Sequence, residues 1–192
     1  MTFTPQKCII LVMDEVKRKG VTEMKKLPEL LAPAGSYETL VSAVKGGADA
    51  VYLGGKMFNA RMNAKNFDDD GIKKAVSFCH ENGVKLYVTL NTLIYDKNFK
   101  DALKYAEQLY LSGIDALITA DLGFSDTLHK YIPGFELHAS TQMSGHTAAM
   151  GHELSRLGFS RMVIARETSA ENIRTIVQRS PIEVELFIHG AL

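Results

Sequence analysis

The sequence predicts an α/β protein, a parallel (β/α)8 barrel of the TIM type that stops after its seventh strand. Four segments share one pattern: a helical stretch, a glycine, a few mixed residues, a continuous apolar run and a polar or glycine position. They begin at Gly46, Asn82, Ser112 and Leu157. A glycine just past a helix end closes the helix, and a continuous apolar run is typical of a parallel strand covered by helices.

Each element of the barrel follows from its local pattern. Strands are predicted, in chain order, at residues 28–32, 50–54, 85–91, 115–120, 135–140, 161–166 and 183–189. Helices are predicted where apolar residues recur at helical spacing, at 36–46, 69–82, 98–112, 122–131, 145–157 and 169–179. This alternation indicates a parallel sheet, for which a barrel is favoured and a doubly wound open sheet is the alternative.

The two ends of the chain lie outside this repeating pattern. Residues 24–192 are expected to form an incomplete barrel, and residues 1–23 an N-terminal extension to which the pattern assigns no role. Without an eighth unit, the first and last strands would present unpaired backbone groups. We therefore expect the chain to form a homo-oligomer, to aggregate, or to need a second chain that completes the barrel.

Composition excludes several classes of protein. The 192 residues carry 22 basic and 22 acidic side chains, so net charge gives no support for a strongly basic nucleic-acid surface. The two cysteines, Cys8 and Cys79, cannot supply the four thiolates of a zinc or iron–sulfur site, so no metal is expected in this chain. The apolar run at 8–13 is too short to cross a membrane. These features predict a cytoplasmic protein without membrane contact.

Polar residues gather where the predicted strands end, which in a parallel barrel is where chemistry takes place. The catalytic candidates are His138, Gln142, Arg166 and His189. Two histidines at equivalent strand ends indicate function, although each could equally be a hydrogen-bonded core residue. Arg166 suits a carboxylate or phosphate ligand, or it pairs with the neighbouring Glu167.

A second group of residues is predicted to bind substrate at the same end of the barrel. Its members are Gly35, Gly54, Gly55, Arg61, Asn91, Asp121 and Glu167. Simpler roles exist for several of them, since the paired glycines could form a tight turn and Asn91 and Asp121 could cap helices. The loop at 60–67 is long for a strand-to-helix connection, so it is either a solvated linker or a lid with donors for an anion.

Five segments together resemble the peptidase U32 family, the collagenase-like protease group. In chain order they are ELLAPAGSYETLVSAVKGGADAVYLGG, VKLYVTLNTL, GIDALITADLG, ELHASTQMS and FIHGAL. The resemblance covers about residues 27–192 and implies a barrel-like catalytic domain. It also implies a 4Fe–4S cluster held by four cysteines in complete members, where a cysteine directly follows the HGAL segment. Those cysteines would lie beyond Leu192, and neither Cys8 nor Cys79 matches them.

The resemblance leaves three functions open. The first is hydroxylation of RNA (tRNA uridine or ribosomal RNA) or of small aromatic precursors, with RNA or a small prephenate-like anion as substrate. The second is proteolysis of a protein substrate, as the family name implies. The third is a non-catalytic subunit that needs a complementing chain. The sequence contains no G-x-S-x-G motif, and this favours the first alternative.

Overall fold

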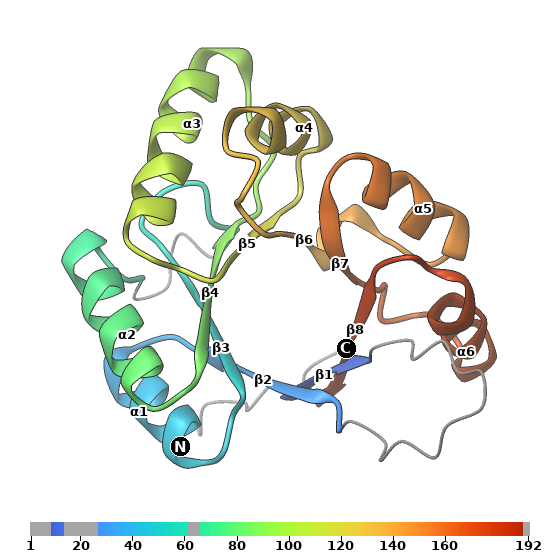
Figure 1. Cartoon of the computed structure of the whole chain (residues 1–192), viewed down its shortest axis with the longest axis horizontal. Helices are drawn as coiled ribbons and strands as arrows, with labels where there is room; N and C mark the ends of the chain where they lie inside the picture. The colour runs from blue at the N-terminus through green and yellow to red at the C-terminus, as the bar shows by residue number, and fades with distance from the viewer. Residues whose placement is uncertain (1–8, 14–26, 61–65, 190–192) are drawn as a thin grey trace, which may run out of the picture.

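The computed structural model describes residues 9–13, 27–60 and 66–189, and their strands close into a barrel (Figure 1). The strands are β1 (Ile9–Met13), β2 (Glu29–Ala34), β3 (Ala50–Gly54), β4 (Lys85–Leu90), β5 (Ala116–Thr119), β6 (Leu137–Ala139), β7 (Phe159–Val163) and β8 (Glu183–His189). Their order around the barrel is their order in the chain, and β2 to β8 are parallel. The parallel barrel predicted from the sequence is confirmed.

Helices surround the barrel on its outside (Figure 1). They are α1 (Tyr37–Lys45), α2 (Asp69–Glu81), α3 (Asp96–Leu111), α4 (Leu122–Tyr131), α5 (Ala148–Arg156) and α6 (Ala170–Arg179), with a short 3-10 helix η1 (Thr141–Met143) after β6. None of these described helices combines the length and the apolar character needed to cross a membrane.

The repeated glycine sits at the turn from a helix to the next strand. Gly47, Gly83, Gly113 and Gly158 have φ angles of 88°, 69°, 84° and 88°. These values lie in the left-handed region that residues with a Cβ seldom adopt, so each glycine ends one helix and starts the approach to the next strand. The repeat seen in the sequence is therefore a repeat of this helix-to-strand turn.

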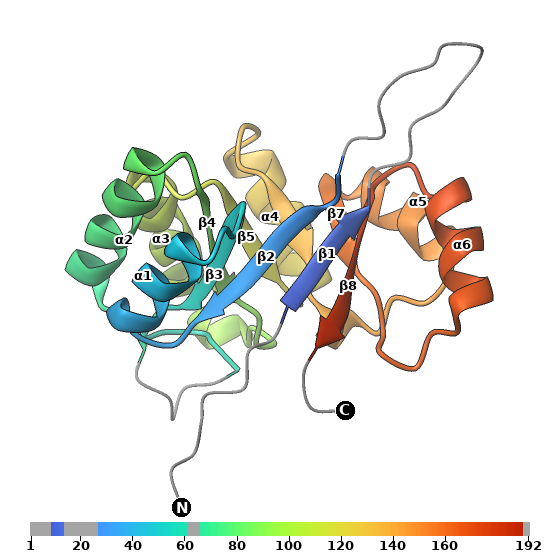
Figure 2. The same cartoon turned by 90° about the horizontal axis from the view of Figure 1, so that it is seen from below.

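The eighth position of the barrel is taken by β1, which is antiparallel to both of its neighbours. Leu11 pairs with Leu30 of β2 on one side and with Leu186 of β8 on the other. Figure 2 shows β1 between these two strands, with no helix of the described chain over it. The expectation of two unpaired strand edges is wrong, because an apolar run within residues 1–23 supplies the missing backbone partners.

The side chains of the barrel strands alternate between two environments. On β4, Leu86, Val88 and Leu90 pack outward into the core shared with the helices. Tyr87 points inward and joins a second cluster with Leu31, Ala50, Ala116 and Ile118. Both faces are buried, which explains why the strands read as continuous apolar runs. At the carboxyl ends of the parallel strands the barrel interior opens into a cavity. Toward their amino ends it holds a cluster of charged residues.

Candidate functional site

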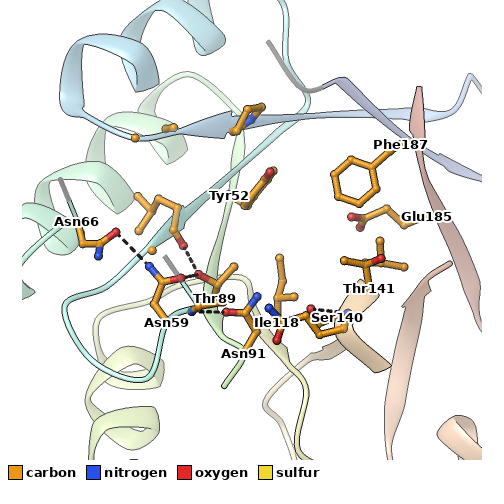
Figure 3. A pocket seen from close by; sticks show the side chains of 18 of the residues that line it. Tyr52, Asn59, Asn66, Thr89, Asn91, Ile118, Ser140, Thr141, Glu185 and Phe187 are labelled. Atoms are coloured by element: carbon orange, nitrogen blue, oxygen red, sulfur yellow. Dashed lines mark hydrogen bonds between the residues drawn. The ribbon is translucent and has the colours of Figure 1, made fainter. Parts of the chain in front are cut away.

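A cavity of about 370 Å³ opens at the carboxyl ends of the parallel strands (Figure 3). Tyr52 from β3 and Phe187 from β8 are its aromatic walls, and Ile118 and Val163 add apolar surface. The remaining side chains that line it are mostly polar: Asn59, Asn66, Thr89, Asn91, Ser140, Thr141, Gln142, Arg166 and Glu185. Such a mixture of aromatic walls and a few polar groups is typical of a small-molecule or cofactor site.

Amide side chains on one side of the cavity tie the β3–α2 loop to the end of β4. Asn59 is almost fully buried and donates from Nδ2 to Asn66 Oδ1 at 3.0 Å. Thr89 Oγ1 lies 3.3 Å from Asn59 Oδ1, and Asn91 Oδ1 accepts a hydrogen bond from the Ala60 N–H at 3.1 Å. These contacts hold the described part of the loop against the cavity.

Gly54 makes this arrangement possible. A Cβ at this position would overlap the Asn59 amide and would lie 3.0 Å from Asn66 Oδ1. The end of β3 therefore approaches the two asparagines more closely than any residue with a side chain permits.

The opposite side of the cavity is built by the ends of β6, β7 and β8. Ser140 begins the helix η1, and its Oγ accepts from the Gln142 N–H at 3.3 Å. The guanidinium of Arg166 lies 4.6 Å from the centroid of the Phe187 ring, which places an exposed cation at the rim. An aromatic face stabilises such a cation while leaving its N–H groups available to an anionic ligand.

Charged side chains fill the barrel below the cavity. Arg161 is 2% exposed and donates to Glu29 at 2.8 Å and to Glu183 at 2.7 Å. Tyr87 also donates to Glu29, at 2.9 Å. Burial opposes ionisation of Glu29, but the charge and hydrogen bonds of Arg161 outweigh it, so the pKa of this carboxyl is lowered. Glu29 is therefore a carboxylate at neutral pH.

Glu185 connects this charged cluster to the cavity, which it lines. Its Oε2 lies 3.5 Å from Arg161 Nη1 and has no hydrogen-bond partner among the described residues. Burial raises the pKa of Glu185 to about 7, and Arg161 offsets this only in part because it already bonds two other carboxylates. Glu185 can thus exchange a proton near neutral pH.

His138 lies inside the barrel and does not line the cavity. Its Nε2 is 3.0 Å from Glu136 Oε1, and its ring meets Tyr87 edge-on at a centroid distance of 4.8 Å. Burial lowers the pKa of His138 to about 4, so the neutral ring donates to the Glu136 carboxylate. The expectation that His138 lies at the open end of the barrel with the other candidates is wrong. Ser140, two residues further along the chain, lines the cavity instead.

The structure brings five of the predicted site residues together at the cavity: Gly35, Gly54, Asn91, Gln142 and Arg166. Asp121 instead caps α4 by accepting from the Phe124 N–H at 2.9 Å, and it also accepts from the Ile94 N–H. Gly55 faces the Tyr105 hydroxyl, and Glu167 is exposed away from the cavity lining. Arg61 lies outside the described residues, and of His189 only the backbone, in β8, is described.

The cavity residues that were not selected from the sequence include Tyr52, Asn59, Glu185 and Phe187. A signal for Glu185 exists, since it is the only charge in the apolar stretch Val184–Ile188. A charge in such a strand must be compensated in the barrel interior. Tyr52 and Phe187 carry no such signal, because inward and outward residues of a strand buried on both faces have the same apolar character.

The cysteines do not fit the iron–sulfur cluster implied by the family resemblance. Cys79 lies in the core on α2, and burial raises the pKa of its thiol to about 11, with a smaller effect from the Asp115 charge. Cys8 lies outside the described residues. Within the described part of the chain, no three His, Cys, Asp or Glu side chains are placed to hold a metal ion.

A parallel (β/α) barrel with a polar cavity at the carboxyl ends of its strands has the architecture of a barrel enzyme. Residues 35–192 match peptidase family U32, and the chain belongs to this family. The family includes proteins that hydroxylate RNA as well as proteins named for proteolysis, as its relatives show.

Three relatives illustrate this range. A 23S rRNA 5-hydroxycytidine synthase of Escherichia coli is 44% identical over 85% of this chain and 24% of its own length. The tRNA hydroxylation protein P1 of Bacillus subtilis is 39% identical over 90% of this chain and 41% of its own length. A collagenase of Porphyromonas gingivalis is 34% identical over 85% of this chain and 42% of its own length. The chain thus spans between a quarter and about two fifths of these relatives.

Solved structures share the fold. The U32 peptidase Mk0906 matches with a TM-score of 0.62 at 14% identity, over 79% of this chain and 65% of that one. A putative deoxyribose-phosphate aldolase of Coccidioides immitis matches with a TM-score of 0.53 at 12% identity, over 76% of this chain and 63% of that one. At these identities the likeness extends to the barrel fold alone.

Proposed function

We propose that this chain provides the substrate-binding barrel of an RNA-hydroxylation protein that acts on a pyrimidine base in the cytoplasm. The observation that carries the proposal is the cavity between Tyr52 and Phe187, with amides, hydroxyls and a carboxyl around it. The RNA-hydroxylation relatives, at 44% and 39% identity, support the same substrate class.

The cavity has the features that a single unstacked base requires. Proteins that act on one base of a nucleic acid hold it between aromatic or apolar side chains and read its polar edge by hydrogen bonds. Tyr52 and Phe187 supply rings, and Gln142 and Asn91 supply amide groups near the opening. Arg166 at the rim suits the phosphate of the same nucleotide, because a guanidinium binds phosphate oxygens through paired N–H groups.

This local binding site is compatible with the overall charge of the chain. Because acidic and basic residues are equal in number, the net charge of the chain supplies no attraction for the phosphate backbone. Recognition of RNA would then depend on the base in the cavity and on a few cations such as Arg166. A small anionic co-substrate would find the same guanidinium at the rim.

Proteolysis is the second candidate function, and the collagenase relative favours it. A hydrolytic serine or cysteine needs a neighbouring base for activation. Within residues 27–60 and 66–188, the hydrogen bonds of the histidine side chains go to Asp115, to Glu136 and to the Ser144 carbonyl, and none joins a serine, threonine or cysteine side chain. Cys79 is buried with a raised pKa. The geometry therefore supports the RNA proposal better.

The test compares RNA nucleosides and proteolysis in the source organism. Disruption of the gene should remove a hydroxylated pyrimidine from digests of ribosomal or transfer RNA, measured by liquid chromatography and mass spectrometry. Complementation with the complete gene should restore it, whereas an Arg166→Ala version should restore less. Unchanged RNA nucleosides, together with gelatin cleavage that depends on the gene, would overturn the proposal in favour of proteolysis.

A further inference from the structure

We infer that Glu185 binds the polar edge of the substrate base through its carboxyl group, one oxygen of which has no hydrogen-bond partner within the described chain. The inference rests on the proposed function and names the residue of this cavity that contacts the base. It begins from the position of Glu185, which is 1% exposed yet lines the cavity beside Phe187 (Figure 3).

The first step is that the protein leaves the Glu185 carboxyl incompletely bonded. Arg161 donates to Glu29 and Glu183 at 2.8 and 2.7 Å, whereas its contact with Glu185 is a 3.5 Å ion pair. The Glu185 Oε2 makes no hydrogen bond within the described chain. A buried polar atom without a partner is unfavourable, and a ligand in the cavity would supply one.

The second step concerns the charge state of this carboxyl. The described titratable side chains of the charged cluster are Glu29, Lys85, Tyr87, Glu136, His138, Arg161 and Glu183, of which Lys85 and Glu136 are exposed to solvent. Arg161 and Lys85 are cations, Glu29, Glu136 and Glu183 are opposing carboxylates, and His138 is neutral. The adjacent strand β1 has the sequence IILVM and adds no titratable group. Glu185 is the third carboxylate beside the single guanidinium of Arg161, so little positive charge is left to stabilise its ionised form. Its neutral form is therefore readily populated.

The third step matches this group to a ligand. A neutral carboxyl presents one O–H donor next to one carbonyl acceptor. Cytosine presents the complement, a ring nitrogen that accepts and an amino group that donates, so two hydrogen bonds form. Uracil presents a ring N–H that donates beside a carbonyl that accepts, so the same carboxyl, turned over, forms two hydrogen bonds with uracil as well. A carboxylate has acceptors only, so it forms at most one of the two hydrogen bonds with either base. Stacking on Tyr52 or Phe187 holds either base in plane but does not distinguish them.

The test uses cytidine and uridine as probes, because neither carries a phosphate that titrates near neutral pH. Binding to the 192-residue chain is measured by NMR titration at about pH 5.5 and about pH 8.5. Cytidine should bind about tenfold or more tightly at the lower pH, since the neutral carboxyl then predominates. Uridine should show the same dependence on pH, because it too forms two hydrogen bonds only with the neutral carboxyl. Binding of the two nucleosides that does not change between the two pH values, or binding of neither, would overturn the inference.

Three variants separate a ligand contact from a structural role. Glu185→Gln keeps one donor and one acceptor, so it should retain cytidine binding and lose the pH dependence. Glu185→Met should lose binding at both pH values. Glu183→Gln is the matched control, because Glu183 shares Arg161 but does not line the cavity, and it should keep the pH dependence. If Glu185→Gln and Glu183→Gln behave alike, Glu185 has no role in binding the base.

The outcomes also separate this inference from the proposed function. If disruption of the gene removes a hydroxylated pyrimidine while Glu185→Met still binds cytidine normally, the inference fails and the function stands. If the RNA nucleosides are unchanged, the function fails whatever the nucleoside titrations show.

Discussion

Arg161 is the side chain that compensates the carboxylates in the barrel interior. It lies on β7 and bonds Glu29 of β2 and Glu183 of β8, two strands that are separated by β1. Its ion pairs therefore cross the position of the antiparallel strand and connect three parts of the barrel wall. Arg161 and Glu185 are buried, and Glu29 and Glu183 are only partly exposed, so loss of Arg161 leaves carboxylates that water solvates poorly.

Replacement of this arginine should destabilise the fold strongly. We expect Arg161→Met to lower the free energy of unfolding by about 3–5 kcal/mol at neutral pH, measured by urea denaturation. The folded-state pKa of Glu29 is lowered, so its contribution is present above its unfolded pKa and fades as the pH falls through the folded pKa. The penalty should therefore shrink in acid. The exposed Arg156→Met is the control and should change stability little; equal losses in both variants would contradict this account.

Glu185 should make stability depend on pH in the opposite direction. Burial raises its folded-state pKa from the ordinary value of 4.5 to about 7. The folded protein therefore holds a proton that the unfolded chain releases, and stability falls as pH rises through this window. His138, with a pKa lowered to about 4, has the reverse effect between about 4 and 6.5. The difference between wild type and Glu185→Gln isolates Glu185, and it should shift by about 3 kcal/mol in favour of the variant by pH 8. A difference independent of pH would show that Glu185 is ionised throughout.

The residues of the site were only partly predictable from the sequence. Glycine and amide positions at strand ends, such as Gly54 and Asn91, were found because the strand pattern stops there. Arg161 and Glu29 were missed, since a single charge in an apolar strand does not reveal which distant charge it meets. Those two residues are 132 positions apart, and only the closure of the barrel brings them together.

At the scale of elements, the tight junction between β3 and its loop is the feature most sensitive to substitution. Gly54→Ala would drive a Cβ into the Asn59 amide, so the loop or the strand must shift. We expect a loss of about 1–3 kcal/mol in unfolding free energy and weaker ligand binding, measured by denaturation and by nucleoside titration. Gly35→Ala is the control, because Gly35 also lines the cavity but a Cβ there meets nothing within 4 Å. Comparable losses in both variants would show that close packing at Gly54 is not the cause.

The elements themselves were more predictable than the residues. A glycine in the left-handed conformation follows a helix at four corresponding places. Because the backbone requires glycine there, the same helix–glycine–strand pattern recurs in the sequence each time. The strand β1 is not part of this repeating sequence pattern. It consists of five residues and is antiparallel, and its partners Leu31 and Phe187 lie far along the chain. Local patterns cannot show a pairing that exists only once the barrel closes.

At the scale of the whole molecule, β1 decides whether the barrel has edges. With β1 in place, the described strands form a closed ring, and neither β2 nor β8 offers free backbone groups along the paired stretch. Closure removes the edges through which sheets associate. The 192-residue chain should therefore elute as a single defined species and unfold cooperatively, rather than associate through open strands.

Disruption of β1 should restore the edges. Leu11 pairs with Leu30 on one side and Leu186 on the other, and proline at this position removes an N–H from the centre of the sheet. We expect Leu11→Pro to associate on size-exclusion chromatography and to lose hydrogen-exchange protection in β2 and β8. Leu11→Ala keeps the backbone N–H, so it should lose some stability but remain closed and unassociated. If Leu11→Pro keeps the elution volume and the protection of wild type, β1 is not what closes the barrel, and β2 and β8 must be shielded in another way.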